Sequence, residues 1–383
     1  MKKVMVLADF NATGGTGTYL GQALEYLCSR YSVFLYLNKD QRKSPLVEGF
    51  ARLGVALLWA PEALYPLDRF LIRLSSRLKV QLFYSFLRDS LLRLWLDARY
   101  HPDFNFISQG GGCNYFAFLK GKKPLLMVTH SLFDQSMFSL PAGGLYIRLF
   151  NGIRKEGIRI CSVSEYSREL FRRNIHCESL ANCTTIVHNF GNDPGTNDRE
   201  ASGIITILTI GHVIGYKNPL VWLEVAREVV RRYPAGVRFV WAGDGELLAD
   251  MRRRSSGMEA VAFVGFQKDT ESLYRESGIY FQPSSLENHS IAVVEAMAQG
   301  LPCVVSDVGA MRESIEDGQE GFVSPANSVE QYVESLSVLI EDAGRRRELG
   351  TNARKKYERL FTKARWEQDM DAILRSILDR VNS

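Results

Sequence analysis

Short apolar runs bounded by turn residues alternate with longer amphipathic stretches along most of the chain. Runs of this length are typical of buried strands, and their alternation with helical patterns predicts repeated βαβ units and a largely parallel sheet. Helical patterns lie at 17–30 and 164–174 in the first half. The predicted strands of that half are 2–8, 33–37, 55–60, 104–108, 124–130, 158–164 and 184–189.

The alternation stops at 190–203, a polar stretch rich in Gly, Asn and Asp that is typical of a link between domains. It then starts again, and from about residue 345 to 383 the pattern is purely helical. Two similar halves joined by a turn-rich link predict two Rossmann-like domains facing a cleft. The apolar and amphipathic segments of the second half are 204–211, 217–232, 236–243, 260–266, 278–284, 292–300, 301–307 and 320–325.

The length of 383 residues agrees with two domains of about 150 to 200 residues each. Apolar content of 46% and charged content of 23% are those of a soluble globular protein, and no apolar run approaches the ~18 residues of a membrane span. The N-terminal MKKVMVLADF begins like a signal peptide, but Asp9 interrupts its short apolar part and no cleavage site follows. We interpret it as the first buried strand.

The six cysteines include no C-x-x-C pair, so we expect neither structural zinc nor a disulfide framework, and a reduced cytosolic setting. The net charge of +4 is unevenly distributed. Residues 1–195 hold 24 Lys and Arg against 15 Asp and Glu, whereas the remainder holds 23 against 28. This asymmetry indicates that the halves meet different partners, with an anionic surface expected at the first.

Ligands of open parallel sheets bind beyond the carboxyl ends of the strands. After the first predicted strand, Gly14, Gly15, Gly17 and Thr18 belong to a glycine-rich turn whose backbone a ligand could approach closely. The dinucleotide fingerprint requires a further glycine where this chain has Leu20, so a nicotinamide or flavin site is disfavoured. The turn is expected to border the cleft, and a tight turn without a ligand is the alternative.

Four consecutive strand ends of the second half carry glycines, a lysine and glutamates. A helix is predicted to begin at about Ser290, and a helix start is a favourable site for a phosphate. Glu287 and Glu295 flank this helix start. They are either ordinary helix acids, or they contact a ligand that has both phosphates and hydroxyls. The other residues at these strand ends are His212, Lys217, Gly243, Asp244, Gly245 and Gly265.

The succession GHVIGYKNP, AGDGELL, VAFVGF and QPSSLENHSIAVVEAMAQGLPCVVSDVGAMRESIEDGQEGFVSP resembles the donor-binding domain of retaining GT-B glycosyltransferases of family 4. The E-x7-E signature of that family matches Glu287 and Glu295. More loosely, VTHSLFD, CSVSEYSRELFRR and IVHNFGND resemble its histidine loop, its serine-containing turn and its interdomain hinge. The resemblance is strong over 204–325 and diffuse over 40–120.

The resemblance implies a nucleotide diphosphate-sugar donor on the second domain. The backbone amides of Ser290 and Ile291 would hold its diphosphate, since these residues match the family's diphosphate-binding positions. Glu295 matches the glutamate that binds the ribose hydroxyls, and Glu287 the one that contacts the transferred sugar; carboxylates accept well from hydroxyls. The expected donor-binding set also includes Gly15, His212, Lys217, Gly243, Asp244, Asn288 and His289.

Three residues are expected to be catalytic by resemblance: Glu287, Lys217 and His130. Lys217 matches the lysine that neutralises the leaving diphosphate, a fixed cation at a site of developing charge. His130 matches a histidine near the transferred sugar, although a structural histidine at a strand end is the alternative. Many relatives have an arginine where this chain has His212, and the shorter, partly charged imidazole leaves the second phosphate contact open.

No metal and no other cofactor is expected. The Asp-x-Asp triplet typical of metal-dependent glycosyltransferases occurs here only as 369–371, inside a helical pattern, where a solvated face is predicted. Retaining glycosidases use a carboxylate nucleophile, and no residue stands out for that role. We therefore favour a same-face displacement in which the leaving phosphate takes the proton of the acceptor hydroxyl.

The stretch 61–100 interleaves seven Arg and Lys residues with aromatic residues. This composition suits a helix on an anionic lipid surface, and a pair of core helices with solvated basic faces is the alternative. Relatives with lipid-linked acceptors slightly favour the membrane.

The sequence therefore predicts an α/β protein of GT-B fold. Residues 1–195 would bind the acceptor, 204–360 the donor, and 361–383 would form a helix that crosses back to the first domain. The expected function is metal-independent retaining transfer of a hexose-type sugar from a UDP- or GDP-sugar to a glycan or lipid-linked acceptor. The protein would be cytoplasmic or peripheral to the inner face of the plasma membrane, without a nucleic-acid partner. A sugar-nucleotide 2-epimerase and a catalytically silent binding subunit are the alternatives.

Overall fold

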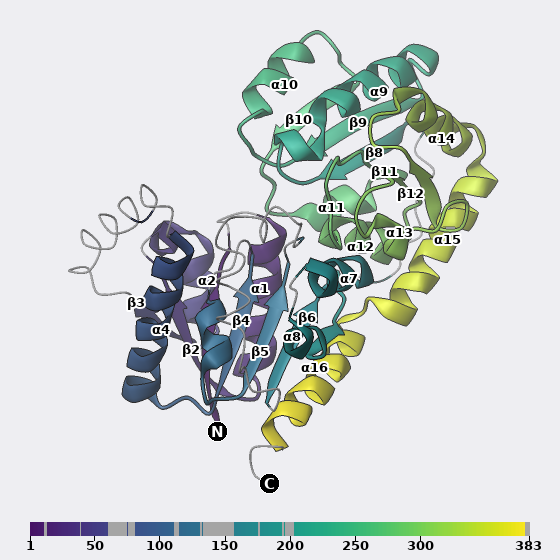
Figure 1. Ribbon diagram of the computed structural model, residues 1–383. Coiled ribbons are helices and arrows are strands. Elements are labelled where there is room, and N and C mark those ends of the chain that lie inside the picture. Colours follow the sequence, from purple (N-terminus) through teal and green to yellow (C-terminus); the bar gives the residue numbers. More distant parts are fainter. Residues whose placement is uncertain are drawn as a thin grey trace. The chain divides into compact units, whose positions relative to one another are not determined.

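The structure, a computed structural model, describes residues 1–10, 14–38, 40–59, 75, 81–110, 115–130, 132, 157–174, 177–193, 195 and 203–379. Its contacts divide the chain into two compact units. Unit 1 consists of Met1–Val187 with Glu367–Ser383, and unit 2 of His188–Trp366. Each unit contains one parallel sheet flanked by helices (Figure 1). The predicted α/β class and the predicted parallel sheets are thereby confirmed.

Unit 1 is built on a sheet of seven parallel strands in the order β3-β2-β1-β4-β5-β6-β7. The strands are β1 (Lys3–Ala8), β2 (Ser32–Leu37), β3 (Ala56–Trp59), β4 (Phe104–Gln109), β5 (Leu125–Thr129), β6 (Ile158–Ser162) and β7 (Thr184–Ile186). The described helices are α1 (Gly15–Cys28), η1 (Asp40–Lys43), α2 (Leu46–Arg52), α4 (Gln81–Tyr100), η3 (Phe116–Lys120), α7 (Glu165–Asn174), α8 (Glu178–Ala181) and α16 (Lys363–Leu378).

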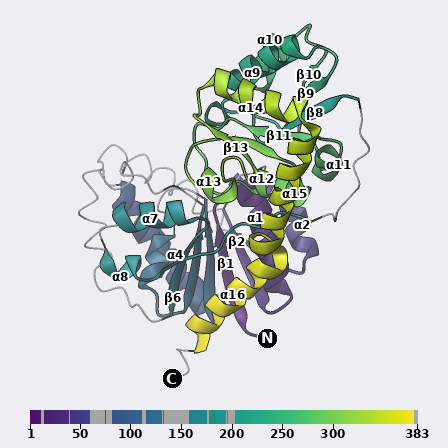
Figure 2. The same ribbon diagram turned by 90° about the vertical axis from the view of Figure 1, so that its right-hand side faces the viewer.

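Both faces of the unit 1 sheet are covered by helices. Buried side chains of α4, η3 and α7 form one core with those of β1, β4 and β5. On the other face α16 lies beside α1 (Figure 2), where Tyr26 donates a hydrogen bond of 2.5 Å to Asp371. The central strands are buried on both sides, and β1 and β5 accordingly read as continuous apolar runs. The neighbouring β4 also buries the polar side chains of Asn105, Ser108 and Gln109.

The helical segment at the end of the chain is two helices, since α15 ends at Leu360 and α16 begins at Lys363. The 369–371 triplet lies in α16, and it is not simply a solvated face. Met370 is fully buried, and Asp371 pairs with Arg30 at 3.3 Å besides accepting from Tyr26. This aspartate joins the helix to α1 of unit 1.

Unit 2 has a six-stranded parallel sheet in the order β10-β9-β8-β11-β12-β13. Its strands are β8 (Ile205–Ile210), β9 (Val237–Ala242), β10 (Val261–Gly265), β11 (Ile279–Gln282), β12 (Cys303–Ser306) and β13 (Gly321–Ser324). Its helices are η4 (Gly215–Lys217), α9 (Pro219–Arg232), α10 (Leu248–Arg254), α11 (Thr270–Arg275), α12 (Ile291–Ala298), α13 (Met311–Ser314), α14 (Val329–Glu341) and α15 (Ala343–Leu360).

Two cores hold this unit together. One contains α9 and α14 with Trp222, Trp241 and Phe263, whose rings lie 5.0 to 5.8 Å apart. The other core lies on the opposite face of the same sheet and contains side chains of α12 and α15. The helix α12 is therefore fixed by packing against both the sheet and α15. Within the described residues, no helix combines the length and the apolar character needed to cross a bilayer.

Candidate functional site

The strand order of unit 2 has a switch point between β8 and β11. From β8 the chain moves outward through β9 and β10, and it returns on the other side of β8 at β11. Loops diverge at such a point, which makes it the usual ligand site of an open parallel sheet. The loop after β8 carries Lys217, and the loop after β11 carries Glu287. These two side chains form an ion pair and are 15% and 13% exposed.

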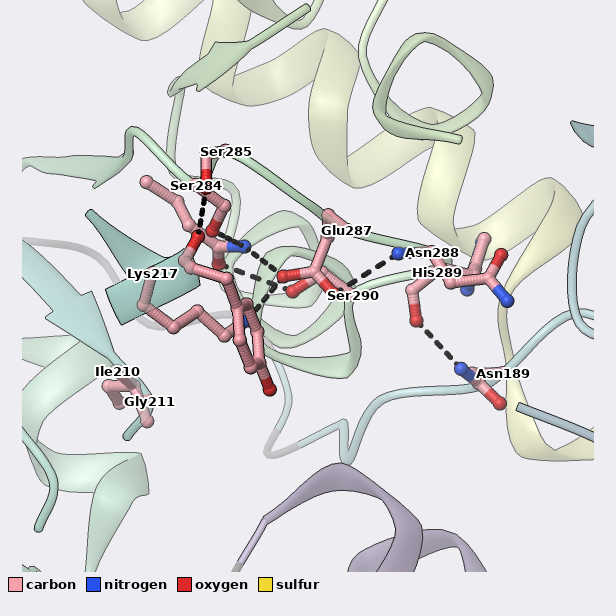
Figure 3. Close-up of polar contacts among 12 residues, drawn as sticks. Asn189, Ile210, Gly211, Lys217, Ser284, Ser285, Glu287, Asn288, His289 and Ser290 are labelled. Atoms are coloured by element: carbon pink, nitrogen blue, oxygen red, sulfur yellow. Dashed lines mark hydrogen bonds and ion pairs between the residues drawn. The ribbon is translucent and has the colours of Figure 1, made fainter. Parts of the chain in front are cut away.

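The Glu287 carboxylate is held from several directions (Figure 3). Its Oε2 accepts from Lys217 and from Gln282 Nε2 at 2.7 Å, and its Oε1 accepts from the backbone of Asn288 at 3.3 Å. Gln282 is itself fixed, because its Oε1 accepts from the hydroxyls of Tyr280 at 2.9 Å and Ser290 at 3.2 Å. Hydrogen bonds thus fix the Lys217–Glu287 ion pair in place beyond the end of β11.

The two loops that carry this pair are joined through their backbones. Ser285 donates to the carbonyl of Tyr216 from its amide at 2.8 Å and from its hydroxyl at 3.2 Å. Gly309 packs on Glu287 so closely that a Cβ at Gly309 would lie 1.8 Å from the backbone carbonyl oxygen of Glu287. The position of Glu287 is therefore set by backbone contacts as well as by its side chain.

Glycines make the remaining strand ends compact. A Cβ on Gly243, whose φ is 152°, would lie 2.0 Å from the carbonyl oxygen of Gly211, and one on Gly245 would lie 2.4 Å from that of Val213. The Val213 amide donates to the Asp244 carbonyl at 2.9 Å. The segment around His212 therefore lies directly against 243–245, so three predicted residues, His212, Gly243 and Asp244, share one edge of the sheet.

The helix α12 begins where the sequence predicted, with Ser290 as the extended N-cap residue. The Ser290 hydroxyl does not cap the helix, because it donates to Gln282 instead. The backbone amides of the first turn therefore donate no hydrogen bond to this side chain. A helix start in this state presents N–H groups and the positive end of the dipole beside Lys217.

Glu295 lies one turn further along α12, in different surroundings from Glu287. Its Oε2 accepts from the Tyr274 hydroxyl at 3.2 Å, and its backbone contacts Gly191. Burial raises its pKa to about 7, against the opposing effect of hydrogen bonds from Tyr274 and the Asn192 backbone. Near neutral pH this carboxyl changes its protonation state.

Asn288 and His289 complete the predicted set on this loop. Asn288 is half-buried, whereas His289 is buried against the rings of His188 and Phe361, with centroids 5.1 and 5.0 Å away. Burial, with a smaller effect of His188, holds the pKa of His289 well below its usual value. The carbonyl of His289 accepts a hydrogen bond from Asn189 at 2.7 Å (Figure 3). His289 thus anchors the loop through its buried ring and its carbonyl.

The predicted residues of unit 1 lie at the carboxyl edge of its own sheet. Gly14, with φ of 117°, is the N-cap of α1, and Gly15, Gly17 and Thr18 form the first turn of this helix rather than a loop. His130 follows β5, where its Nε2 is 3.2 Å from the Ser108 hydroxyl. Burial lowers the pKa of His130 to about 4, so the imidazole is neutral at pH 7.

The residues that sequence reasoning missed are the supporting ones: Gln282, Tyr280, Tyr274 and Asn189. A glutamine at the end of a buried strand was the one available signal. Among the described residues, no group of three or more His, Cys, Asp or Glu is arranged to hold a metal ion. Residues 61–80, apart from Ser75, lie outside the described residues, so the structure adds to the predicted 61–100 surface only through α4.

Comparison with known proteins shows what this chain is similar to. Residues 197–356 match the family model of glycosyl transferases group 1. The chain also superposes on the crystal structure of Anabaena HepE in complex with UDP, with a TM-score of 0.70, 17% identity, and coverage of 98% of this chain and 100% of that one. The galactosyltransferase WaaB of the lipopolysaccharide outer core gives 0.65 at 16% identity, covering 98% and 99%. The chain has the GT-B fold.

Curated relatives match a part of this GT-B chain. An uncharacterized glycosyltransferase of Haemophilus influenzae is 31% identical over 140 residues, which cover 36% of this chain and 40% of the relative. An Escherichia coli enzyme, UDP-Gal:α-D-GlcNAc-diphosphoundecaprenol α-1,3-galactosyltransferase, is 27% identical over 139 residues, covering 35% and 36%. The chain thus spans about two fifths or less of these relatives' lengths.

Proposed function

We propose that this protein is a retaining glycosyltransferase that moves a hexose-type sugar from a nucleotide diphosphate-sugar to a hydroxyl of a glycan or lipid-linked acceptor. The observation that carries the proposal is the Lys217–Glu287 pair, which lies at the switch point of unit 2 beside the start of α12. It falls inside the region that matches glycosyl transferases group 1. A pair of opposite charges suits a ligand that has an anionic diphosphate next to a sugar.

In the proposed mechanism the donor separates this pair. Its diphosphate binds Lys217 and the backbone amides of Ser290 and Ile291 at the start of α12. The Glu287 carboxylate, released from the lysine, then accepts hydrogen bonds from hydroxyls of the transferred sugar. As the bond to the sugar breaks, the charge on the leaving diphosphate grows, and a preorganised cation stabilises that charge most strongly in the transition state.

The remaining roles are proposed from the resemblance to GT-B glycosyltransferases. Glu295 accepts from the ribose hydroxyls, one turn along α12 from the diphosphate, which corresponds to a rise of about 1.5 Å per residue. His130, as a neutral imidazole, exchanges a hydrogen bond with the sugar instead of contributing charge. The acceptor hydroxyl attacks on the face that the diphosphate leaves, and its proton goes to the leaving phosphate. This route requires no carboxylate nucleophile and no metal.

Relatives indicate which substrates to test first. HepE has been crystallised with UDP and with UDP-glucose, and the E. coli relative uses UDP-galactose and a diphosphoundecaprenol-linked acceptor. UDP-sugars and a polyprenyl diphosphate-linked saccharide are therefore the leading donor and acceptor classes, with GDP-sugars as the comparison. An EDTA-treated sample tests metal independence, because activity should persist.

We further propose that unit 1 contacts an anionic membrane through α4. From residue 87 to 98 the exposed side chains of this helix are all apolar: Leu87, Leu91, Leu94, Trp95 and Ala98. The four large ones are 39–60% exposed. Their spacing places them on one helical face, an arrangement that suits the acyl boundary of a bilayer.

Charge supports an anionic lipid as the occupant of this face. Arg99 follows it on α4, and Lys120 and Lys122 are exposed on and after η3, which packs against α4. Residues 1–195 also carry the excess of basic residues. A lipid-linked acceptor would be met at such a surface.

One experiment separates the proposed transfer from its alternatives. The protein is incubated with UDP- and GDP-sugars, with and without lipid extract, while free nucleotide and sugar isomers are followed. Nucleotide release that depends on the acceptor supports transfer. Isomer formation without acceptor would instead indicate an epimerase, and binding without turnover a silent subunit.

A further inference from the structure

The segment His188–Asp193, with which unit 2 begins, is held against α12 at its beginning, middle and end. At its beginning, Asn189 is 4% exposed and donates through Nδ2 to the His289 carbonyl at 2.7 Å (Figure 3). His289 directly precedes Ser290, the N-cap residue of α12. The Asn189 amide therefore fixes the backbone at the point where the helix begins.

The middle of the segment lies against Glu295. A Cβ on Gly191 would be 2.9 Å from the Glu295 nitrogen, closer than real Cβ atoms come to a neighbour, and 3.0 Å from the Glu295 Cα. The Gly191 carbonyl accepts from the Tyr357 hydroxyl at 3.0 Å, and the Asn192 backbone donates to the Glu295 carboxylate. Glu295 is thus enclosed between this segment and Tyr274.

The end of the segment is tied to the last residue of α12. Arg354 donates to both carboxylate oxygens of Asp193, at 2.6 and 2.9 Å, and also to the Ala298 carbonyl at 2.5 Å. Any connection between two units must rest on some surface. Here, however, the buried Asn189 amide lies against the start of α12, which is proposed to bind the diphosphate. Gly191, which has no room for a Cβ, lies against Glu295, which is proposed to bind the ribose.

We propose that Asn189 and Gly191 are positioning residues of the donor site, which hold the start of α12 and the Glu295 carboxyl in place without touching the donor. This inference rests on the proposed function, since it assigns the positioned groups to a nucleotide-sugar. It also means that the first residues of unit 2 are part of the site, because the backbone that directly follows unit 1 is the backbone that holds the donor helix.

The test compares donor affinity in the wild type and four variants, by calorimetry with whichever of UDP-glucose and GDP-mannose the wild type binds. Asn189→Ala removes one buried donor, so affinity should fall about tenfold. Asn189→Asp keeps the size of the side chain but not its N–H group, and the affinity for the nucleotide-sugar should fall at least as far. Gly191→Ala forces the backbone away from Glu295 and should have the largest effect.

Asn192→Ala is the matched control. Asn192 is exposed and holds Glu295 through its backbone, which the substitution retains, so affinity should stay within about twofold of wild type. Unfolding of each ligand-free variant shows how much folded protein is present. If Gly191→Ala does not fold, the two Asn189 variants still decide the question.

A pH series distinguishes positioning from a general loss of structure. The diphosphate of these donors is esterified at both ends and does not titrate near pH 7, whereas the pKa of Glu295 is about 7. Wild-type affinity should therefore rise through that pH as the carboxylate forms. In Gly191→Ala water reaches the carboxyl, so the midpoint should move to lower pH.

The groups that face Glu295 do not produce such a midpoint. Tyr274, Tyr280 and Tyr357 have pKa values raised by burial, and Asp193 is held by Arg354 with a lowered pKa. If the wild type binds donor and the Asn189 and Gly191 variants bind it equally well with the same midpoint, the positioning role is wrong and the proposed function stands. If the wild type binds neither donor, the proposed function fails, and this inference fails with it.

Discussion

The two sheets of this protein have similar strand orders, but different residues lie at their carboxyl edges. Beyond the switch point of unit 2, a lysine and a glutamate are paired beside a helix start, and the glutamate also accepts a hydrogen bond from Gln282. In unit 1 the corresponding edge presents a glycine-capped helix and a histidine that burial keeps neutral. Under the proposed function this difference is expected, since a diphosphate needs a counter-charge and an acceptor hydroxyl does not.

The largest effect is expected at Lys217. Replacement by alanine removes the cation that faces the leaving diphosphate, so turnover should fall by about a hundredfold or more. Acceptor-dependent nucleotide release measures this. Lys268→Ala, at an exposed position of the same unit, is the control and should keep full activity. Equal activity of the two variants would remove the distinction between the edges.

The ionised Glu295 carboxyl should favour donor binding but lower the stability of the fold. Its pKa rises from an ordinary 4.5 to about 7 on folding, so the stability it contributes is complete below pH 4.5 and is lost as pH rises through 7. At pH 8 the ionised carboxyl should therefore lower the free energy of unfolding by about 3 kcal/mol.

Glu295→Gln should recover much of this stability at pH 8 and little at pH 4, while donor affinity falls about tenfold or more. Denaturant unfolding at the two pH values, together with calorimetry, tests both effects. A glutamine variant that binds donor normally would place the ribose elsewhere.

The apolar face of α4 extends the comparison to surfaces. Leu91→Glu with Leu94→Glu should reduce flotation with vesicles containing phosphatidylglycerol by about tenfold, because two carboxylates would have to enter the bilayer surface. Leu220→Glu, at an exposed leucine of α9 in unit 2, should leave flotation unchanged. Activity on a soluble acceptor should survive in all three proteins. Undiminished flotation of the double variant would exclude this face.

The smallest effect is expected at His130. His130→Gln keeps a hydrogen-bonding group of similar size, so kcat should fall about tenfold or less while the affinity for nucleotide diphosphate is unchanged. Since the pKa of His130 is about 4, the wild-type rate should show no histidine titration between pH 5 and 8 that the variant lacks. A midpoint near 6 that disappears in the variant would mean that the imidazole acts as a charged group.

The sequence predicted the parts of this structure that depend on periodicity and on turn residues. Buried parallel strands appear as apolar runs, and Ser290 marked the start of α12. Side-chain partners at long separation leave no such pattern. Nothing in the spacing indicates that Gln282 orients Glu287, that Asn189 supports His289, or that Asp371 joins α16 to α1.

The two glutamates illustrate the same limit. Their eight-residue spacing identified them as a pair, but their environments differ because of residues far away in the chain. Lys217 comes from another strand end, and Gly191 and Tyr274 from a linker and another helix. Motif spacing thus predicted where these acids lie, whereas burial and pKa required the fold.

The most direct test of the central claim is a crystal structure of the protein with UDP-glucose or GDP-mannose bound. The account predicts the diphosphate within hydrogen-bonding distance of Lys217 Nζ and of the Ser290 and Ile291 amides, with Glu287 released from the lysine onto the sugar. A donor bound elsewhere, or bound while the Lys217–Glu287 pair stays intact, would contradict it.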